Sequence, residues 1–172
     1  QNSKDWTFIS SENQSEDKNT KNLTYLSSIK QFEGQYAKDW TLKSTDYVDF
    51  NLSDFKGRVL LIEFTGPSCI GCVKVQPFVN LLDSAHKKNE NFKLIALNLT
   101  VTGDNGRTRA YNIKHGIRVL SLLDDKGVYK QYGVTEIPSF FLIDKTGKII
   151  YTHVGLFTNE TFLKLNNEIN KN

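Results

Sequence analysis

The only two cysteines of the chain, Cys69 and Cys72, are separated by two residues, a spacing that suits chemistry in which two thiols act together. An apolar run of strand type, residues 59–62, precedes them, and apolar residues recur with helical periodicity after them, as at Val75 and Leu82. The thiols are therefore expected where a strand ends and a helix begins. Backbone N–H groups at a helix N-terminus favour a thiolate, which is the species that attacks a disulfide. We interpret the pair as a redox-active dithiol.

Two other uses of a Cys-x-x-Cys pair are a zinc site and a structural disulfide. A zinc site needs four ligands, but the chain has no second cysteine pair, and His86, His115 and His153 lack the spacing of zinc ligands. A structural disulfide that closes so short a loop removes little chain entropy from the unfolded state. Both alternatives stay open at this point, and the redox dithiol is favoured over them.

The composition is that of a globular protein with a substantial core. The chain has 172 residues, of which 38% are hydrophobic and 12% aromatic, and its net charge is +3. It has no dense run of Lys and Arg with interleaved aromatic residues, so no nucleic-acid partner is expected. No apolar stretch approaches the length that spans a membrane.

Cysteine usage and the absence of Met bear on the compartment of the protein. Neither cysteine lies outside the motif, which fits an oxidising compartment where stray thiols are hazardous, although a cytosolic protein can show the same usage. Because the chain contains no Met, we expect a processed or trimmed protein, from which a signal peptide or anchor could have been removed. The expected location is extracytoplasmic, in the periplasm or at the outer face of the cell membrane, and a membrane tether through the removed N-terminus is one option.

The pattern of residues changes near residue 36. Residues 1–35 are polar and rich in Asn, Ser and Lys, and are expected to form a linker or extension. Residues 36–172 mix strand and helix patterns and are expected to form one domain. The expected elements are a hairpin over 40–52, strands over 59–64, 92–99, 119–123, 139–144 and 148–151, and helices over 70–88, within 103–116, over 126–132 and after an N-cap at Thr158.

Further motifs accompany the cysteine pair. Pro77 lies five residues after Cys72, where thioredoxins carry a helix-kinking proline. The segment Tyr-Gly-Val-Thr-Glu-Ile-Pro-Ser at 132–139 resembles the thioredoxin segment around the cis-proline. The segment Asp-Lys-Thr-Gly-Lys at 144–148, followed by a strand and Gly155, resembles the hairpin that closes that fold.

Together these segments resemble the thioredoxin fold over about three quarters of the chain. The hairpin before the core and an insertion near residues 100–120 resemble its extracytoplasmic TlpA/ResA-like branch. The resemblance implies an α/β thioredoxin-like fold, with a central mixed sheet flanked by helices, an N-terminal hairpin and a central insertion. It also implies a thiol–disulfide oxidoreductase that needs no metal and no cofactor beyond its own Cys69–Cys72 disulfide.

The resemblance implies different roles for the two thiols. Cys69 is expected to be the attacking cysteine, at the helix N-terminus and nearer the surface. Cys72 is expected to be the resolving cysteine, one turn further on and more buried, and to release the reduced partner from a mixed disulfide.

A substrate-binding region is also implied beside the dithiol. The Ile137–Pro138 bond is expected to be cis, because X-Pro bonds tolerate that form. The backbone of Ile137 is then expected to face an extended substrate. Ser68 and Ile70, on either side of the first cysteine, are assigned to the same region as Ile137 and Pro138.

Glu63 interrupts an otherwise apolar strand six positions before Cys69. That strand is expected to be buried on both faces, and burying a carboxyl without use is costly. Members of the family often have an acid there, and a buried carboxyl with a raised pKa can exchange a proton with Cys72. The alternative is that Glu63 points to solvent. The lysine that faces this acid in thioredoxins is absent, since Ala96 lies at about that place.

The motif departs from the thioredoxin pattern, with Ser68 in place of Trp and Gly71 in place of Pro. The two residues between the cysteines, Ile70 and Gly71, tune the reduction potential of the pair. The favoured function is exchange of disulfides with protein partners, as a reductant supplied by a membrane-bound electron donor. The alternatives are a redox-inactive binding module and a peroxiredoxin-like peroxidase, which needs Thr where Gly66 stands.

Overall fold

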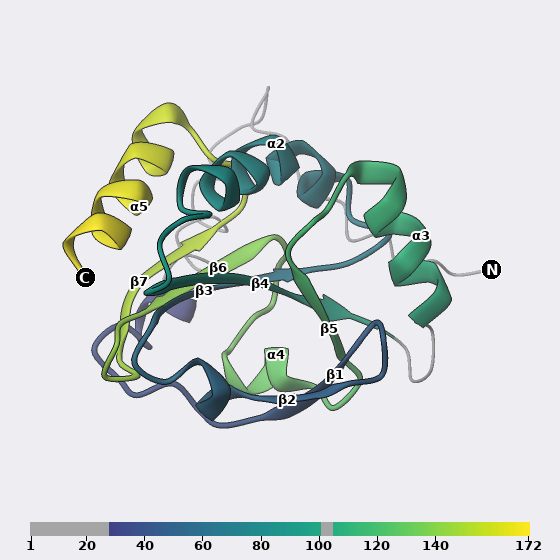
Figure 1. The fold of residues 1–172 in the computed structure, drawn as a ribbon, viewed down its shortest axis with the longest axis horizontal. Helices are drawn as coiled ribbons and strands as arrows, with labels where there is room; N and C mark the ends of the chain where they lie inside the picture. The colour runs from purple at the N-terminus through teal and green to yellow at the C-terminus, as the bar shows by residue number, and fades with distance from the viewer. Residues whose placement is uncertain (1–27, 101–104) are drawn as a thin grey trace.

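A seven-stranded mixed sheet runs through the centre of the molecule in the computed structural model, which describes residues 28–100 and 105–172 (Figure 1). The order of its strands is β2-β1-β5-β4-β3-β6-β7. The strands are β1 (Thr41–Ser44), β2 (Asp49–Asn51), β3 (Val59–Thr65), β4 (Phe92–Leu99), β5 (Leu120–Asp124), β6 (Ser139–Ile143) and β7 (Ile149–Val154). The helices are the 3-10 turn η1 (Leu52–Phe55), α2 (Ile70–Ala85), α3 (Asn105–His115), α4 (Val128–Gln131) and α5 (Asn159–Lys171).

The pairing of the strands agrees with the expected mixed sheet. Strands β3 and β4 are parallel, as expected for two strands joined through a helix, and β5 continues the parallel part beyond β4. Strand β6 pairs antiparallel with β3 on the other side, and β7 pairs antiparallel with β6. The turn between β6 and β7 uses Gly147 at a φ of +93°, a conformation that glycine adopts without steric cost. The expected N-terminal hairpin is formed by β1 and β2.

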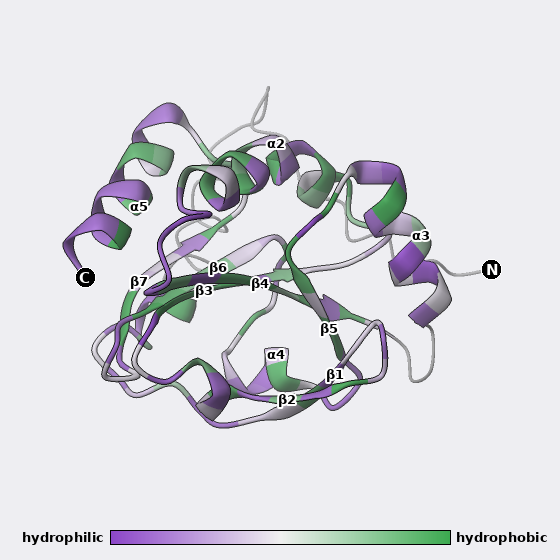
Figure 2. Cartoon of the chain, viewed as in Figure 1, coloured by the Kyte–Doolittle hydropathy of each residue, from purple (hydrophilic) through white to green (hydrophobic). Residues whose placement is uncertain are grey.

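The sheet separates two hydrophobic clusters. Helices α2 and α5 lie over one face, and α3 lies on the same side near β5, while α4 and η1 lie on the other side (Figure 1). Figure 2 shows the central strands in hydrophobic green and much of α5 in hydrophilic purple. Side chains alternate between the faces along β3, so Leu61 packs with the α2 cluster while Ile62 and Phe64 pack with the opposite one.

Helix α2 is shorter than expected, because it ends at Ala85 instead of near residue 88. His86 leaves the helical conformation, and the residues after it are polar and exposed, so no apolar contact extends the helix. The N-cap expected for α5 is confirmed. The side chain of Thr158 accepts a hydrogen bond from the backbone N–H of Thr161 at 3.1 Å.

The folded part of the chain begins before the expected boundary at residue 36. Ile29 is only 1% exposed and belongs to the core cluster that contains Phe64. Oε1 of Glu33 accepts hydrogen bonds from the backbone N–H and the hydroxyl of Thr152, each at 2.9 Å. Residues 28–35 are therefore part of the domain, and the rest of the expected extension lies outside the described residues. Among the described helices, none has the length and hydropathy to cross a membrane.

Candidate active site

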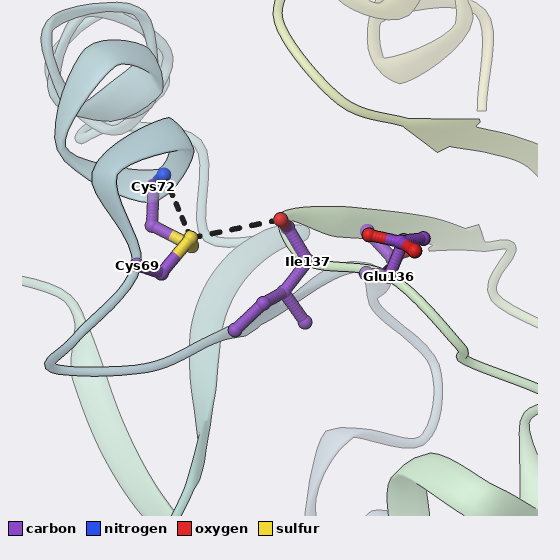
Figure 3. The surroundings of a disulfide bond; sticks show 5 residues. Cys69, Cys72, Glu136 and Ile137 are labelled. Atoms are coloured by element: carbon purple, nitrogen blue, oxygen red, sulfur yellow. Dashed lines mark hydrogen bonds between the residues drawn. A yellow bond between two sulfur atoms is a disulfide. The ribbon is translucent and has the colours of Figure 1, made fainter. Parts of the chain in front are cut away.

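The two cysteines lie where β3 leads into α2, and they are joined as a disulfide (Figure 3). Cys69 is the N-cap residue of α2, with extended backbone, and Cys72 lies in the first helical turn. The backbone N–H of Cys72 points at Sγ of Cys69, with a distance of 3.0 Å between nitrogen and sulfur. After reduction, the same N–H is placed to stabilise a thiolate on Cys69.

The exposure of the pair differs from the expectation. Cys69 is 2% exposed and Cys72 is fully buried, so the expected contrast between a surface thiol and an inner thiol is small in the disulfide form. The surface beside the disulfide is formed instead by its neighbours, because Ser68 is exposed and Ile70 is 58% exposed. A partner that reaches Cys69 must therefore pass over these two side chains.

The loop before β6 lies directly against the disulfide. The bond between Ile137 and Pro138 is cis, as expected. The carbonyl oxygen of Ile137 lies 3.6 Å from Sγ of Cys69, and Figure 3 shows it directed at the disulfide. The half-buried side chain of Glu136 lies on the far side of Ile137 from the sulfur atoms (Figure 3). Ile137 as a whole is 2% exposed, and its carbonyl oxygen faces the disulfide (Figure 3).

Two hydrogen bonds hold this loop in place. The hydroxyl of Ser139 donates to the carbonyl oxygen of Glu136 at 2.6 Å, and the backbone N–H of Gly155 donates to the carbonyl oxygen of Pro138 at 2.8 Å. The side chain of Ile137 packs toward Gly66, because a Cβ built at Gly66 would lie 3.3 Å from Cδ1 of Ile137. Cys69, Cys72, Ile137 and Pro138 therefore form one rigid group.

Glu63 is buried on β3 and does not point to solvent. Its side chain lies on the face of β3 that α2 covers, two residues after Leu61. Burial raises the pKa of Glu63 to about 8, and the nearby Thr65 hydroxyl opposes this increase in part. The carboxyl is therefore poised to gain or lose a proton close to neutral pH. Its proton exchange with Cys72 stays a prediction.

The polar surroundings of Glu63 were not found by sequence reasoning. Thr65 on β3 and Tyr111 on α3 are both buried, and the charge of Glu63 is close enough to raise the pKa of Tyr111 further. Thr65 had a signal, because it lies two residues after Glu63 and so on the same face of the strand. Tyr111 had no such signal, because no local sequence pattern shows that α3 brings this residue close to β3. No group of three or more potential metal ligands comes together within residues 28–100 and 105–172.

Comparison with known proteins identifies the family. The family model described as Redoxin matches residues 32–169. The chain belongs to the Redoxin family. The thiol–disulfide oxidoreductase ResA of Bacillus thuringiensis subsp. konkukian is 31% identical over 131 residues, which cover 74% of this chain and 72% of the relative. The thioredoxin-like protein YneN of Bacillus subtilis is 28% identical, with 74% of each chain covered.

A solved structure supports the fold of this Redoxin-family chain. The thiol-disulfide oxidoreductase from Bacteroides fragilis NCTC 9343 superposes with a TM-score of 0.70 and 21% identity, covering 78% of this chain and 99% of that one. The fold expected from the sequence, thioredoxin-like with a mixed sheet, is confirmed. With its Cys-x-x-Cys disulfide and its ResA relative, the chain is a thiol–disulfide oxidoreductase.

Proposed function

We propose that this oxidoreductase reduces disulfides of protein partners in an extracytoplasmic compartment and is itself recharged by a membrane-bound electron donor. The proposal rests on one arrangement of residues. Cys69 lies at the start of α2 with the carbonyl group of Ile137 beside it, and Ser68 and Ile70 are exposed next to them. An extended segment that carries a disulfide can lie over Ser68 and Ile70, beside the loop at Ile137, while one of its sulfur atoms approaches Cys69.

The exchange takes place in two steps. The thiolate of Cys69 attacks one sulfur of the partner disulfide, so that a mixed disulfide forms and the partner's other sulfur leaves as a thiolate. The thiol of Cys72 then gives its proton to the carboxylate of Glu63 and attacks Sγ of Cys69. This re-forms the Cys69–Cys72 disulfide and releases the second partner thiolate. Two electrons pass from the dithiol to the partner. The membrane-bound donor then supplies two further electrons, which reduce the Cys69–Cys72 disulfide again.

The direction of electron flow depends on the reduction potential of the pair. Equilibration with glutathione buffers measures it directly. A reductant is expected to have a potential near or below about −270 mV, the value of thioredoxin, so that its reduced form drives reduction of other disulfides. A potential towards about −120 mV, as in a strong oxidant, would reverse the proposed direction.

Trapping tests the partner class and the order of the two steps. Cys72→Ser should accumulate mixed disulfides through Cys69 in living cells, because the resolving thiol is gone. Cys69→Ser is the matched control and should trap far less, because only Cys69 occupies the N-cap position where backbone N–H groups stabilise a thiolate. Partners recovered from the extracytoplasmic fraction with Cys72→Ser support the proposal. Equal trapping by both variants, or only cytoplasmic partners, would contradict it.

A further inference from the structure

Glu63 has no cationic partner in the sheet. The residues that pair with it on the neighbouring strands are Ala96 on β4 and Phe140 on β6. Neither side chain can compensate a negative charge, and none of the ion pairs among the described residues includes Glu63. A carboxylate formed there needs support from hydrogen-bond donors, because an unsupported buried charge is very costly.

Two hydroxyl groups supply candidate donors. Thr65 is 1% exposed and Tyr111 is 6% exposed. The hydroxyl of Thr65 is the neighbour that lowers the pKa of both Glu63 and Tyr111, so it lies between them. Oε1 of Glu63, Oγ1 of Thr65 and the hydroxyl oxygen of Tyr111 are all buried, and none has a hydrogen bond of full geometry to another group. Three buried polar atoms that share one place and lack other partners are expected to serve one another.

We propose that Tyr111 is a positioning residue for Glu63 that acts through Thr65. The phenol of Tyr111 donates to Oγ1 of Thr65, whose own hydroxyl donates to the carboxylate when Glu63 is ionised. This neutral pair of donors takes the place of a cation. Burial and the charge of Glu63 both raise the pKa of Tyr111, so its phenol keeps its proton throughout the pH range of exchange. The inference rests on the proposed role of Glu63 as the proton acceptor for Cys72.

Other ionisable or proton-sharing side chains near this cluster come from α3 and α2. On α3, the ring of His115 lies 4.6 Å from the ring of Tyr111. Arg109, on the same helix, is paired with Asp46 in the turn between β1 and β2. On α2, the buried side chains able to exchange or share a proton are Cys72 and Gln76.

The direct test follows the titration of Glu63 by NMR of the disulfide form, in which neither cysteine titrates. The side-chain carboxyl carbon of Glu63 is labelled with carbon-13 and assigned by its loss in Glu63→Gln. Its midpoint should lie near pH 8 in the parent protein. Tyr111→Phe should move it upward by about one unit, because the support that Tyr111 gives to the charged form through Thr65 is removed. Tyr132→Phe is the matched control: it removes a buried phenol that donates to Lys38 instead, and should leave the midpoint unchanged.

A second measurement leaves Tyr111 unaltered. In the parent protein, the phenol carbon of Tyr111 should show an inflection at the Glu63 midpoint, and Glu63→Gln should abolish it. An unchanged or lowered Glu63 midpoint in Tyr111→Phe, or a Tyr111 signal that does not respond to Glu63, would overturn the inference.

Kinetics separate this inference from the proposed function. Reduced protein releases two thionitrobenzoate ions from Ellman's reagent, the first on attack by Cys69 and the second on resolution by Cys72. At about pH 7, Tyr111→Phe should slow the second release roughly three- to tenfold and leave the first unchanged. It should have no further effect in a Glu63→Gln background. If the two substitutions slow the second release independently, so that their effects multiply in the double variant, the coupling between Tyr111 and Glu63 is overturned. Normal second release in Glu63→Gln alone would refute the proposed role of Glu63, whereas the NMR result would still stand.

Discussion

The carbonyl oxygen of Ile137 lies 3.6 Å from Sγ of Cys69, although 68 residues separate them in the chain. This contact brings the loop with the cis bond next to the sulfur atom that we propose attacks the partner. The position of Ile137 depends in turn on Gly66, since any side chain at Gly66 would press on its Cδ1 atom.

Gly66→Ala should therefore slow the first exchange step. The added Cβ would lie 3.3 Å from Cδ1 of Ile137, so Ile137 must move by a few tenths of an ångström. We expect a rate of attack on Ellman's reagent that is roughly two- to tenfold lower, because small displacements at a reacting centre are costly. Gly106→Ala on α3 is the control, since a Cβ there meets nothing within 4 Å. Equal rates for the two variants would show that the Ile137 contact does not matter for attack.

Ile70 should contribute to recognition of protein partners. It is 58% exposed beside Cys69, and an exposed apolar side chain at an active site is placed to contact a partner. Ile70→Asn should raise the KM for a protein disulfide roughly three- to tenfold, and should change the reaction with small disulfides much less. Leu163→Asn on α5 is the control, because Leu163 is 57% exposed outside the site. A KM that rises equally in both variants would indicate a general surface effect.

Burial of Glu63 should make the stability of the oxidised protein depend on pH. The pKa of Glu63 is raised from 4.5 to about 8, so the folded state holds this proton more tightly than the unfolded state. The contribution of this group to the free energy of unfolding is fully present below about pH 4.5 and is lost as the pH rises through about 8. Between about pH 5 and pH 8 the free energy of unfolding should fall by roughly 3 kcal/mol from this group.

Glu63→Gln should remove that part of the pH dependence. Urea unfolding of the disulfide form at several pH values measures the difference between the parent and the variant, in which all other groups cancel. Parallel curves for the two proteins would mean that Glu63 titrates alike in the folded and unfolded states.

The contact between Gly133 and the N-terminal segment should be essential for stability. Gly133 has a φ of +63°, and a Cβ there would lie 2.7 Å from Cε2 of Phe32. Gly116 has the same φ of +63° but open space around it. Gly133→Ala and Gly116→Ala thus share the conformational cost of a left-handed residue, about 1–2 kcal/mol. Only Gly133→Ala should add about 1–3 kcal/mol for displacing Phe32. Equal losses in urea unfolding would show that Phe32 does not occupy this place.

Much of the fold could be predicted because local patterns and tertiary structure agree. The apolar run at β3, the cysteine pair and the periodicity of α2 are consecutive in the chain, and they place Cys69 at the helix N-terminus. Gly147 and Thr158 likewise have local roles, in a turn and at a cap, that sequence alone reveals. Their positions depend on backbone preferences of a few neighbouring residues.

The remaining features depend on contacts between distant segments. Tyr111 comes beside Glu63 only because α3 packs on the sheet, and α3 itself has weak apolar periodicity. The polar composition of residues 28–35 predicts a linker. In the structure this segment is held by apolar contacts of Ile29 and Phe32 and by hydrogen bonds to the carboxylate of Glu33. The burial of Cys69 likewise depends on the loop at Ile137, whose approach no local pattern encodes.

The N-terminal segment has a consequence for how copies of the protein meet. Strand β7 is the last strand of the sheet, and unpaired strand edges are templates for pairing with other chains. The backbone N–H of Ile149 donates to Gln35, its carbonyl oxygen accepts from Gly34, and the backbone N–H of Thr152 donates to Glu33. Residues 33–35 therefore occupy backbone groups of Ile149 and Thr152 on this edge. At these positions, another molecule can pair with β7 only by displacing the protein's own N-terminal segment.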